Sequence, residues 1–212
     1  MSSAQAQAQL ERQFVSADIA KCIGCGLCEL ACVIQNERSL NVAKSRIKVI
    51  HMTPLACTAV ACRFCEDAPC VRACPRNALS QSEQTGVILV DDERCDLCGW
   101  CVEACPYGAI VVDPERNTVL ICDLCGEEEP KCVEFCPTEA LSLSTEEELR
   151  KKTFSSMASL FSEVRQVIDR GAWQHLFAKA VDIGRKVEEK FKELARWAWE
   201  LGVYPEGGVR GA

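Results

Sequence analysis

Residues 95–106 read Cys-Asp-Leu-Cys-Gly-Trp-Cys-Val-Glu-Ala-Cys-Pro, a run of four cysteines separated by two, two and three residues and followed by proline. The same spacing occurs at residues 22–32, without the proline. Stretched versions at 62–75 and 122–137 lengthen the middle interval to four and six residues and again end in proline. The sixteen cysteines of the four runs are Cys22, Cys25, Cys28, Cys32, Cys62, Cys65, Cys70, Cys74, Cys95, Cys98, Cys101, Cys105, Cys122, Cys125, Cys132 and Cys136.

A chain with 17 cysteines in 212 residues is either a disulfide scaffold or a metal protein. Its first thirteen residues are polar and carry no export signal, and no apolar run approaches the roughly 20 residues that span a bilayer. We therefore expect a cytoplasmic protein with no direct membrane span, although export together with a signal-bearing partner would leave no trace in this sequence. In a reducing compartment, clustered thiols are more often metal ligands than disulfides.

The run at residues 95–106 has the cysteine spacing of bacterial ferredoxins. Three thiolates on one tight loop can reach three corners of one cubane, while the fourth, one helical turn further on, binds a different one. Gly24, Gly26 and Gly99 let the backbone approach closely, so that amide N–H groups can stabilise the negative cluster. Zinc would use pairs of cysteines and would not require four in one run. Four complete runs therefore predict four 4Fe-4S clusters.

Cys57 is the one cysteine outside the runs. Free cysteine is often buried, so we expect a small core residue, with an alternate cluster ligand as the other interpretation. His51 and His175 have no neighbouring cysteine or carboxylate group that suggests a base or a metal site. The chain also lacks a phosphate-binding loop and a dinucleotide-binding fingerprint. These features predict electron relay without a catalytic site.

Similarity between the runs extends beyond cysteine, because residues 71–79 align with 102–110 and with 133–141. Each unit predicts a short strand, a cluster loop, a helical turn and another short strand. Runs of β-branched residues at 87–90 and 118–121 indicate hairpins and not a large sheet. The expected fold class is α+β. Because large apolar residues are few, we expect the clusters to form part of the core and metal binding to be coupled to folding.

From residue 13 to 144 the four runs resemble the four-cluster iron-sulfur subunits of the DMSO reductase and formate dehydrogenase family. They are also similar to small ferredoxin-type subunits of tungsten aldehyde oxidoreductases, carbon monoxide dehydrogenases and hydrogenases. The resemblance implies two bacterial-ferredoxin-like βαβ halves, in which the first run pairs with the fourth and the second with the third. Long insertions of some family members are missing, which favours the compact subunits over the membrane-anchored types.

Four ligand sets follow from this resemblance, although the spacing alone leaves consecutive pairing of the runs open. Set 1 is Cys22, Cys25, Cys28 and Cys136. Set 2 is Cys62, Cys65, Cys70 and Cys105. Set 3 is Cys95, Cys98, Cys101 and Cys74. Set 4 is Cys122, Cys125, Cys132 and Cys32.

Residues 145–212 form a second part with no cysteine. Residues 1–145 hold 12 Lys and Arg against 20 Asp and Glu, whereas residues 146–212 hold 12 against 11. Apolar stripes on either side of Gly171 predict an α-helical hairpin, which Thr145 can cap together with Glu148. We expect this extension to bind a partner or another copy of the chain, partly because its second helix carries aromatics on more than one face. Packing on its own core is the alternative.

The sequence as a whole predicts an electron-transfer subunit that relays electrons between a catalytic oxidoreductase subunit and an external donor or acceptor. We favour a molybdenum or tungsten pterin enzyme as the catalytic partner. The alternatives are a subunit of a hydrogenase or carbon monoxide dehydrogenase complex, and a free-standing polyferredoxin. Nucleic-acid binding is not expected, because the net charge is -7 and no basic stripe is interleaved with aromatic residues.

Overall fold

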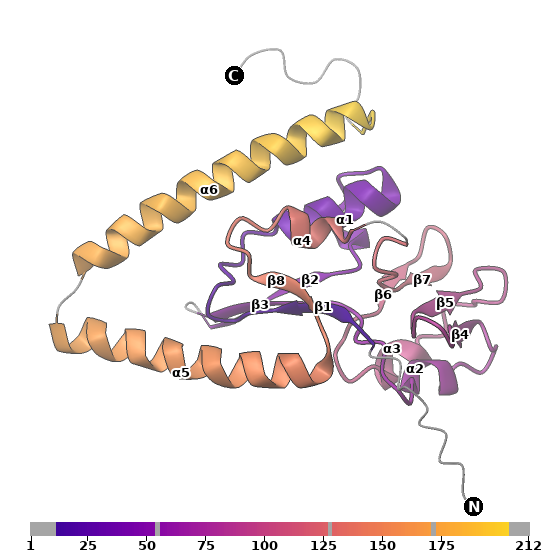
Figure 1. The fold of residues 1–212 in the computed structure, drawn as a ribbon. Coiled ribbons are helices and arrows are strands. Elements are labelled where there is room, and N and C mark those ends of the chain that lie inside the picture. Colours follow the sequence, from indigo (N-terminus) through magenta and orange to yellow (C-terminus); the bar gives the residue numbers. More distant parts are fainter. Residues whose placement is uncertain (1–11, 54–55, 127–128, 171–172, 204–212) are drawn as a thin grey trace, which may run out of the picture.

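The computed structural model describes residues 12–53, 56–126, 129–170 and 173–203. These residues form short helices and four two-stranded antiparallel sheets, followed by two long helices (Figure 1). The mixed α and β class expected from the sequence is confirmed. The strands are β1 (Phe14–Ala17), β2 (Lys48–Thr53), β3 (Ala56–Val60), β4 (Leu79–Gln81), β5 (Ile88–Val90), β6 (Val111–Asp113), β7 (Thr118–Leu120) and β8 (Leu141–Ser144). The helices are α1 (Leu27–Glu37), the 3-10 turn η1 (Val42–Lys44), α2 (Pro69–Arg72), α3 (Trp100–Ala104), α4 (Lys131–Glu134), α5 (Glu146–Arg170) and α6 (Trp173–Glu200).

The sheet pairing determines which cysteine runs meet. Strands β4 and β5 form a hairpin between the second and third runs, and β6 and β7 form one between the third and fourth. Strand β1 lies before the first run and pairs with β8, which follows the fourth, with Phe14 opposite Ser144. This long-range pair brings the first and fourth runs to the same end of the molecule. Helix α1 accordingly packs against α4, and α2 packs against α3.

Cysteines are part of the two main hydrophobic clusters of the ferredoxin-like part. One cluster combines Val15, Ile47 and Leu141 with cysteines of the first and fourth runs. The other combines Leu79 and Ile88 with cysteines of the second and third runs. Sulfur thus occupies interior positions that larger aliphatic side chains usually fill.

A network of ion pairs joins the α1–η1 segment to the β6–β7 hairpin. Asp113 is 1% exposed and binds Lys44 at 3.3 Å and Arg116 at 2.7 Å. Arg116 also reaches Glu37 at 2.6 Å, and Arg46 lies 3.5 Å from the same carboxylate. The network crosses between segments that belong to the two hydrophobic clusters, so it helps to fix one cluster relative to the other.

Helix α5 begins with the expected capping box. The Glu148 N–H donates to the Thr145 hydroxyl at 3.4 Å, and the Thr145 N–H donates to the Glu148 carboxylate at 3.1 Å. One turn later, the Lys152 ammonium donates to the hydroxyls of Ser142 and Ser144 at 3.1 and 2.8 Å. These contacts tie the start of the helix to strand β8.

The second half of helix α6 packs on the ferredoxin-like part of its own chain. Leu194 and Ala198, 1% and 0% exposed, lie in a cluster with residues of α1 and with Phe135. Trp197 stacks on Phe135 with ring centroids 5.3 Å apart. Packing of the extension on its own core, the alternative named above, therefore occurs at this face, where α6 covers the apolar side of α1.

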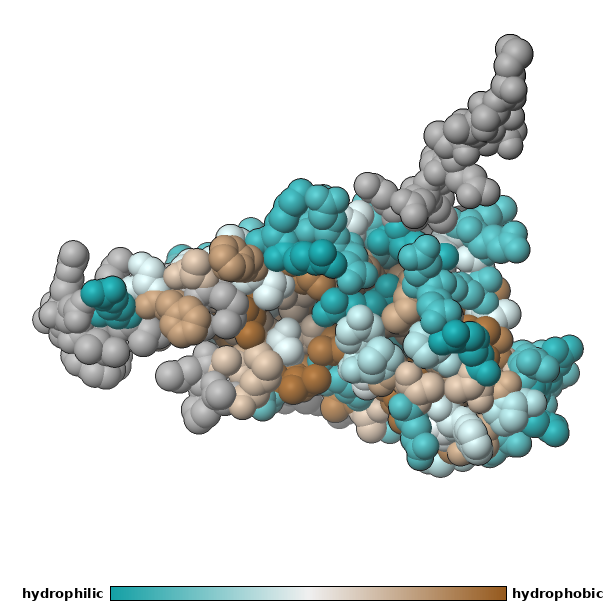
Figure 2. Space-filling model, turned by 90° about the horizontal axis from the view of Figure 1, so that it is seen from below, coloured by the Kyte–Doolittle hydropathy of each residue, from teal (hydrophilic) through white to brown (hydrophobic). Residues whose placement is uncertain are grey.

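The two long helices diverge from the point where they join, with the β1–β8 and β2–β3 sheets between them (Figure 1). Each helix packs on its own face of the core. The two helices therefore lie apart, and their described residues do not pack against each other as the expected hairpin. Phe154 and Phe161 of α5 remain 82% and 68% exposed, and hydrophobic residues are visible along this arm in Figure 2. The side chains of Trp173 and His175 lie outside the described residues. None of the helices in the described ranges has the length and apolar composition of a membrane span.

Replacing Asp113 by asparagine should destabilise the fold by about 2 kcal/mol, because Lys44 and Arg116 would lose their shared buried partner. Burial alone would raise the pKa of Asp113, but hydrogen bonds from Arg116 and Lys44 hold it below its usual range. A carboxylate of this kind adds stability above its unfolded pKa of about 3.9 and loses that contribution as pH falls through its folded pKa. The difference from wild type should therefore be full at pH 7 and shrink below about pH 4.

Anaerobic urea unfolding followed by circular dichroism measures this difference. Glu115→Gln is the matched control, because Glu115 also pairs with Lys44 but its side chain is 73% exposed. Equal losses of stability in the two variants would contradict a special role for the buried carboxylate.

Candidate metal centres

The four cysteine loops share one backbone conformation. The second residue after the first cysteine of each run has a positive φ, and in the first run it is glycine. In three runs the N–H of this residue donates to the sulfur of that first cysteine. In these three runs the loop therefore turns an amide toward sulfur, which is the arrangement that stabilises a thiolate. The four residues are Gly24 (φ 68°), Phe64 (48°), Leu97 (57°) and Leu124 (61°).

The structure brings together cysteines that are far apart in sequence. All four members of set 1 line one cavity, together with Gly24 and Pro137. All four members of set 2 line another cavity. In set 4, Cys122, Cys125 and Cys132 each lie close enough to Cys32 to interact electrostatically. In set 3, Cys101 interacts with Cys95 and Cys74.

Cys98, the remaining member of set 3, lies on the loop between Cys95 and Cys101. Cys98 and Cys25 are the two exposed cysteines among the seventeen, all of which are free thiols. In sets 1, 2 and 4 the chain therefore places three cysteines of one run beside the fourth cysteine of another, without forming a disulfide between them.

The fourth cysteine of a run receives a backbone hydrogen bond from the residue four positions later. In the second, third and fourth runs the donor is an alanine. The residue directly before this alanine, three positions after the cysteine, has a positive φ. The N–H to sulfur distances are 3.3 Å for Ala78 and Cys74, 3.4 Å for Ala109 and Cys105, and 3.2 Å for Ala140 and Cys136.

Cys32 departs from this pattern because α1 continues past it to Glu37. Its sulfur instead accepts the backbone N–H of Arg46 at 3.3 Å and lies 3.6 Å from the Asn36 amide nitrogen. Sequence reasoning missed both donors. The missing proline at position 33 signals the longer helix, but nothing in the sequence indicates that residue 46 returns to this sulfur.

Burial raises the pKa of at least one thiol in each of the four sets. The pKa of Cys62 and of Cys122 rises to about 12, and that of Cys101 to about 11, with desolvation as the largest cause in each. Desolvation also raises the pKa of Cys28 and Cys132. These five thiols would therefore be neutral at pH 7 unless a positively charged group replaces their protons.

A single metal ion does not fit these sites, because no three His, Cys, Asp or Glu side chains within the described ranges converge closely enough to bind one. A 4Fe-4S cluster suits them better. It takes one thiolate at each of four corners, which separates the sulfurs more widely than one tetrahedral ion does. The amides directed at the sulfurs supply the hydrogen bonds that such a cluster requires.

Comparison with known proteins agrees with this chemistry. Residues 53–146 match a family of iron-sulfur proteins. The family is described as a 4Fe-4S dicluster domain, and the match contains the second, third and fourth cysteine runs. This segment is thus similar to 4Fe-4S ferredoxin-type domains, while the first run lies outside the match.

The relatives are electron-transfer proteins and oxidoreductase subunits. The polyferredoxin-like subunit of aliphatic sulfonate oxidoreductase from Pyrococcus furiosus is 44% identical over 89 residues, which cover 42% of this chain and 51% of that protein. The electron transport protein HydN of Escherichia coli is 41% identical over 93 residues, covering 41% and 51%. A tetrathionate reductase subunit of Archaeoglobus fulgidus is 38% identical over 90 residues, covering 42% and 43%. The chain thus spans about half the length of the curated relatives that it matches.

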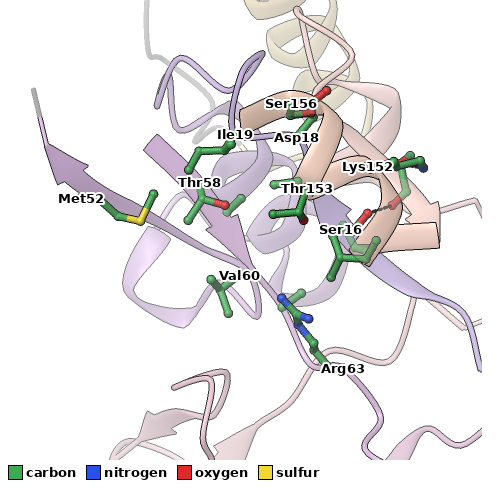
Figure 3. Close-up of a pocket in the computed structure, with 16 residues that line it drawn as sticks. Ser16, Asp18, Ile19, Met52, Thr58, Val60, Arg63, Lys152, Thr153 and Ser156 are labelled. Carbon is green, nitrogen blue, oxygen red and sulfur yellow. Dashed lines mark hydrogen bonds between the residues drawn. The ribbon is translucent and has the colours of Figure 1, made fainter. Parts of the chain in front are cut away.

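A separate cavity of about 240 Å³ lies between α5 and strands β1 and β3 (Figure 3). The Ser16 hydroxyl donates to Ser144 at 2.9 Å, and Lys152 binds Ser144 from the helix side. Arg63 and Asp18 line opposite ends of the cavity (Figure 3). Its lining residues include no cysteine. The cavity beneath α5 is therefore separate from the two cavities that the cysteines line.

Cys98→Ser should remove or damage one cluster and weaken the half of the protein that contains it, because a ligand thiolate is lost. Iron content should fall by up to about four atoms per chain, as measured by colorimetric iron analysis of anaerobic protein. Cys57→Ala is the control and should keep the wild-type iron content. The assignment makes Cys98 a cluster ligand and Cys57 a residue that binds no cluster. Equal losses of iron from both variants would contradict it.

Proposed function

We propose that the sixteen run cysteines hold four 4Fe-4S clusters as sets 1 to 4, in two ferredoxin-like halves within residues 13–144. The observation that carries this proposal is the lining of two cavities by three cysteines of one run and the fourth of another. A bound cluster supplies one-electron oxidation and reduction. The chain's own residues hold the sulfurs, exclude water from them and aim N–H groups at them.

Contacts between sets support an order of 1, 4, 2 and 3 along the molecule. Cys28 of set 1 interacts with Cys132 of set 4, and Cys122 of set 4 interacts with Cys62 of set 2. Sets 2 and 3 contribute cysteines to one hydrophobic cluster. The exposed cysteine Cys25 belongs to set 1, and the exposed Cys98 belongs to set 3. Electron entry and exit near these two cysteines follow from the order.

The function that best fits this arrangement is an electron-transfer subunit with no catalytic site of its own. Its clusters would connect a catalytic oxidoreductase subunit to an external donor or acceptor. A molybdenum or tungsten pterin enzyme is the proposed partner, in line with the resemblance to the DMSO reductase and formate dehydrogenase family. The relatives that are subunits of a sulfonate oxidoreductase and of a tetrathionate reductase support a place in such a complex. We propose the cytoplasm as its compartment.

A subunit of a hydrogenase or carbon monoxide dehydrogenase complex is the second candidate, since the same ferredoxin module serves those enzymes. A free-standing polyferredoxin is less well supported, because the exposed apolar residues of α5 have no role in a freely diffusing carrier. Co-purification of the tagged full chain under anaerobic conditions, followed by metal analysis of the partner, separates these functions.

Residues 145–212 are proposed to have two roles. The second half of α6 covers α1 within the same chain. The outward side of α5, with Phe154 and Phe161, is proposed to bind the catalytic partner or another copy of the chain. Exposed aromatic side chains on a charged helix are typical of interfaces. The near-neutral extension would allow contact where the acidic cluster-bearing part would be repelled by another acidic surface.

Anaerobically prepared protein should contain about sixteen iron atoms and sixteen acid-labile sulfides per chain, because each of the four sets would hold one cubane. Chemical analysis of both elements tests the number of clusters. A reproducible value near eight would exclude four clusters. A zinc content of one per set with little iron would exclude iron-sulfur chemistry altogether.

Phe154→Ser combined with Phe161→Ser should abolish co-purification with the partner and leave the iron content unchanged, because both side chains point away from the core. Lys151→Ala is the matched control on the same helix, where the side chain is 75% exposed and charged. Size-exclusion chromatography then shows whether another copy of the chain is the partner. Retained co-purification and an unchanged elution volume in the double variant would contradict the proposed interface.

A further inference from the structure

His51 and Cys57 form a pair on the β2–β3 hairpin, outside the sixteen run cysteines. The two residues are directly opposite in the strand register, and the Cys57 sulfur lies 3.2 Å from His51 Nδ1. Cys57 is 8% exposed, whereas His51 is exposed. A thiol on the inner side of the hairpin is therefore joined to an imidazole that reaches solvent.

This pair lies directly against Gly24 in the first ligand loop. A Cβ atom at Gly24 would be 2.5 Å from His51 Cε1 and 2.9 Å from the Cys57 sulfur, both closer than packed atoms allow. Gly24 also has a φ of 68°, which side chains rarely adopt. A side chain at position 24 would therefore clash with His51 and Cys57, which fill the open side of Gly24.

The other three runs fill the same place differently. At the matching position they carry a side chain, and the backbone keeps a positive φ of 48° at Phe64, 57° at Leu97 and 61° at Leu124. Phe64 is 1% exposed, so its own side chain packs this loop in place. In the first run no side chain is present to do so. The hairpin pair takes over the packing that a phenylalanine or leucine provides elsewhere.

The backbone N–H of Gly24 is the group through which this packing can affect a cluster bound by set 1. Burial raises the pKa of Cys22, and the hydrogen bond from the Gly24 N–H opposes that effect. An N–H group on a ligand sulfur stabilises the more negative, reduced form of a cluster and so raises its reduction potential. A peptide that is free to rotate would lose part of this hydrogen bond.

We propose that His51 and Cys57 are positioning residues for the set 1 cluster, which hold the Gly24 peptide so that its N–H stays on the Cys22 sulfur. The inference rests on the proposed binding of a cluster by set 1. Its consequence is that the reduction potential of one cluster out of four depends on two residues that do not ligate it.

The experiment compares reduction potentials of the full-length holoprotein in wild type, His51→Ala, Cys57→Ala and Cys57→Ser. Each is prepared anaerobically and titrated with dithionite while the reduced clusters are followed by electron paramagnetic resonance. Cys25→Ser, which alters an exposed member of set 1, identifies the signal of that cluster. Met52→Ala is the matched control, because Met52 is the next residue on β2, lines the cavity beneath α5 and is 50% exposed.

The expected result is unchanged iron content with a more negative potential for the set 1 signal alone, in both His51→Ala and Cys57→Ala. Cys57→Ser should remain closer to wild type, because serine can still hydrogen-bond to His51. Met52→Ala should match wild type.

Two results would overturn the proposal. Four unchanged potentials in His51→Ala and Cys57→Ala would show that the pair only packs the hairpin. Loss of about four iron atoms in Cys57→Ala but not in His51→Ala would make Cys57 a ligand. If wild-type and Cys25→Ser protein instead give the same resonance signals, no cluster is bound by set 1. The proposed function on which the inference rests would then fail as well.

Discussion

Thiol groups occupy much of the interior of residues 12–144, where a domain of this size would usually place leucine and phenylalanine. Cys28, Cys70, Cys101 and Cys132 all belong to the hydrophobic clusters. A buried thiol is tolerable while it is neutral, but a buried thiolate requires nearby positive charge or hydrogen-bond donors. The backbone supplies donors at the first and fourth cysteines of the runs. The same arrangement that disfavours bare thiolates thus suits a metal cluster, and we propose that folding is coupled to metal binding.

The backbone meets this requirement with turns that most residues avoid. Positive φ values recur two residues after the first cysteine and three residues after the fourth, as at Asn77, Gly108 and Glu139. Each non-glycine residue among them costs of order 1 kcal/mol. In six of these turns an N–H group is directed at a cysteine sulfur. The conformations are repeated although the residues differ, which indicates that the direction of the amide, and not the side chain, is what the four loops share.

Ion pairs and apolar packing hold the remaining segments of the structure together. The ion pairs around Asp113 join the two hydrophobic clusters, and the long helices cover separate faces of the core. Helix α6 places Leu194 and Ala198 on α1, so part of the extension belongs to the fold of this chain. Helix α5 is anchored at its start by Lys152 and the serines of β8, and leaves Phe154 and Phe161 in solvent. One extension therefore covers part of the core, and its exposed side on α5 is the surface proposed to bind a partner.

Local spacing was sufficient to predict the α+β class, the short strands, the loop glycines and the capping box at Thr145. These features depend on residues within about one helical turn of each other, and their side-chain chemistry is visible in the sequence. The grouping of the cysteine runs was available only through resemblance to a family, because spacing permits consecutive pairing as well. The tertiary structure brings the first and fourth runs together through the β1–β8 pair, which joins Phe14 to Ser144.

Other features were decided by tertiary structure alone. The Arg46 amide on Cys32, the burial of α6 on α1 and the place of His51 and Cys57 beside Gly24 all join segments separated by many residues. No local pattern encodes them, since Cys57 reads as an ordinary buried cysteine and His51 as an ordinary polar strand residue. The sequence determined which atoms could bind iron and how each loop turns, because those are short-range properties of the backbone. Which loops share a site, and which neighbours hold them, depended on how the apolar faces of distant segments could be buried together.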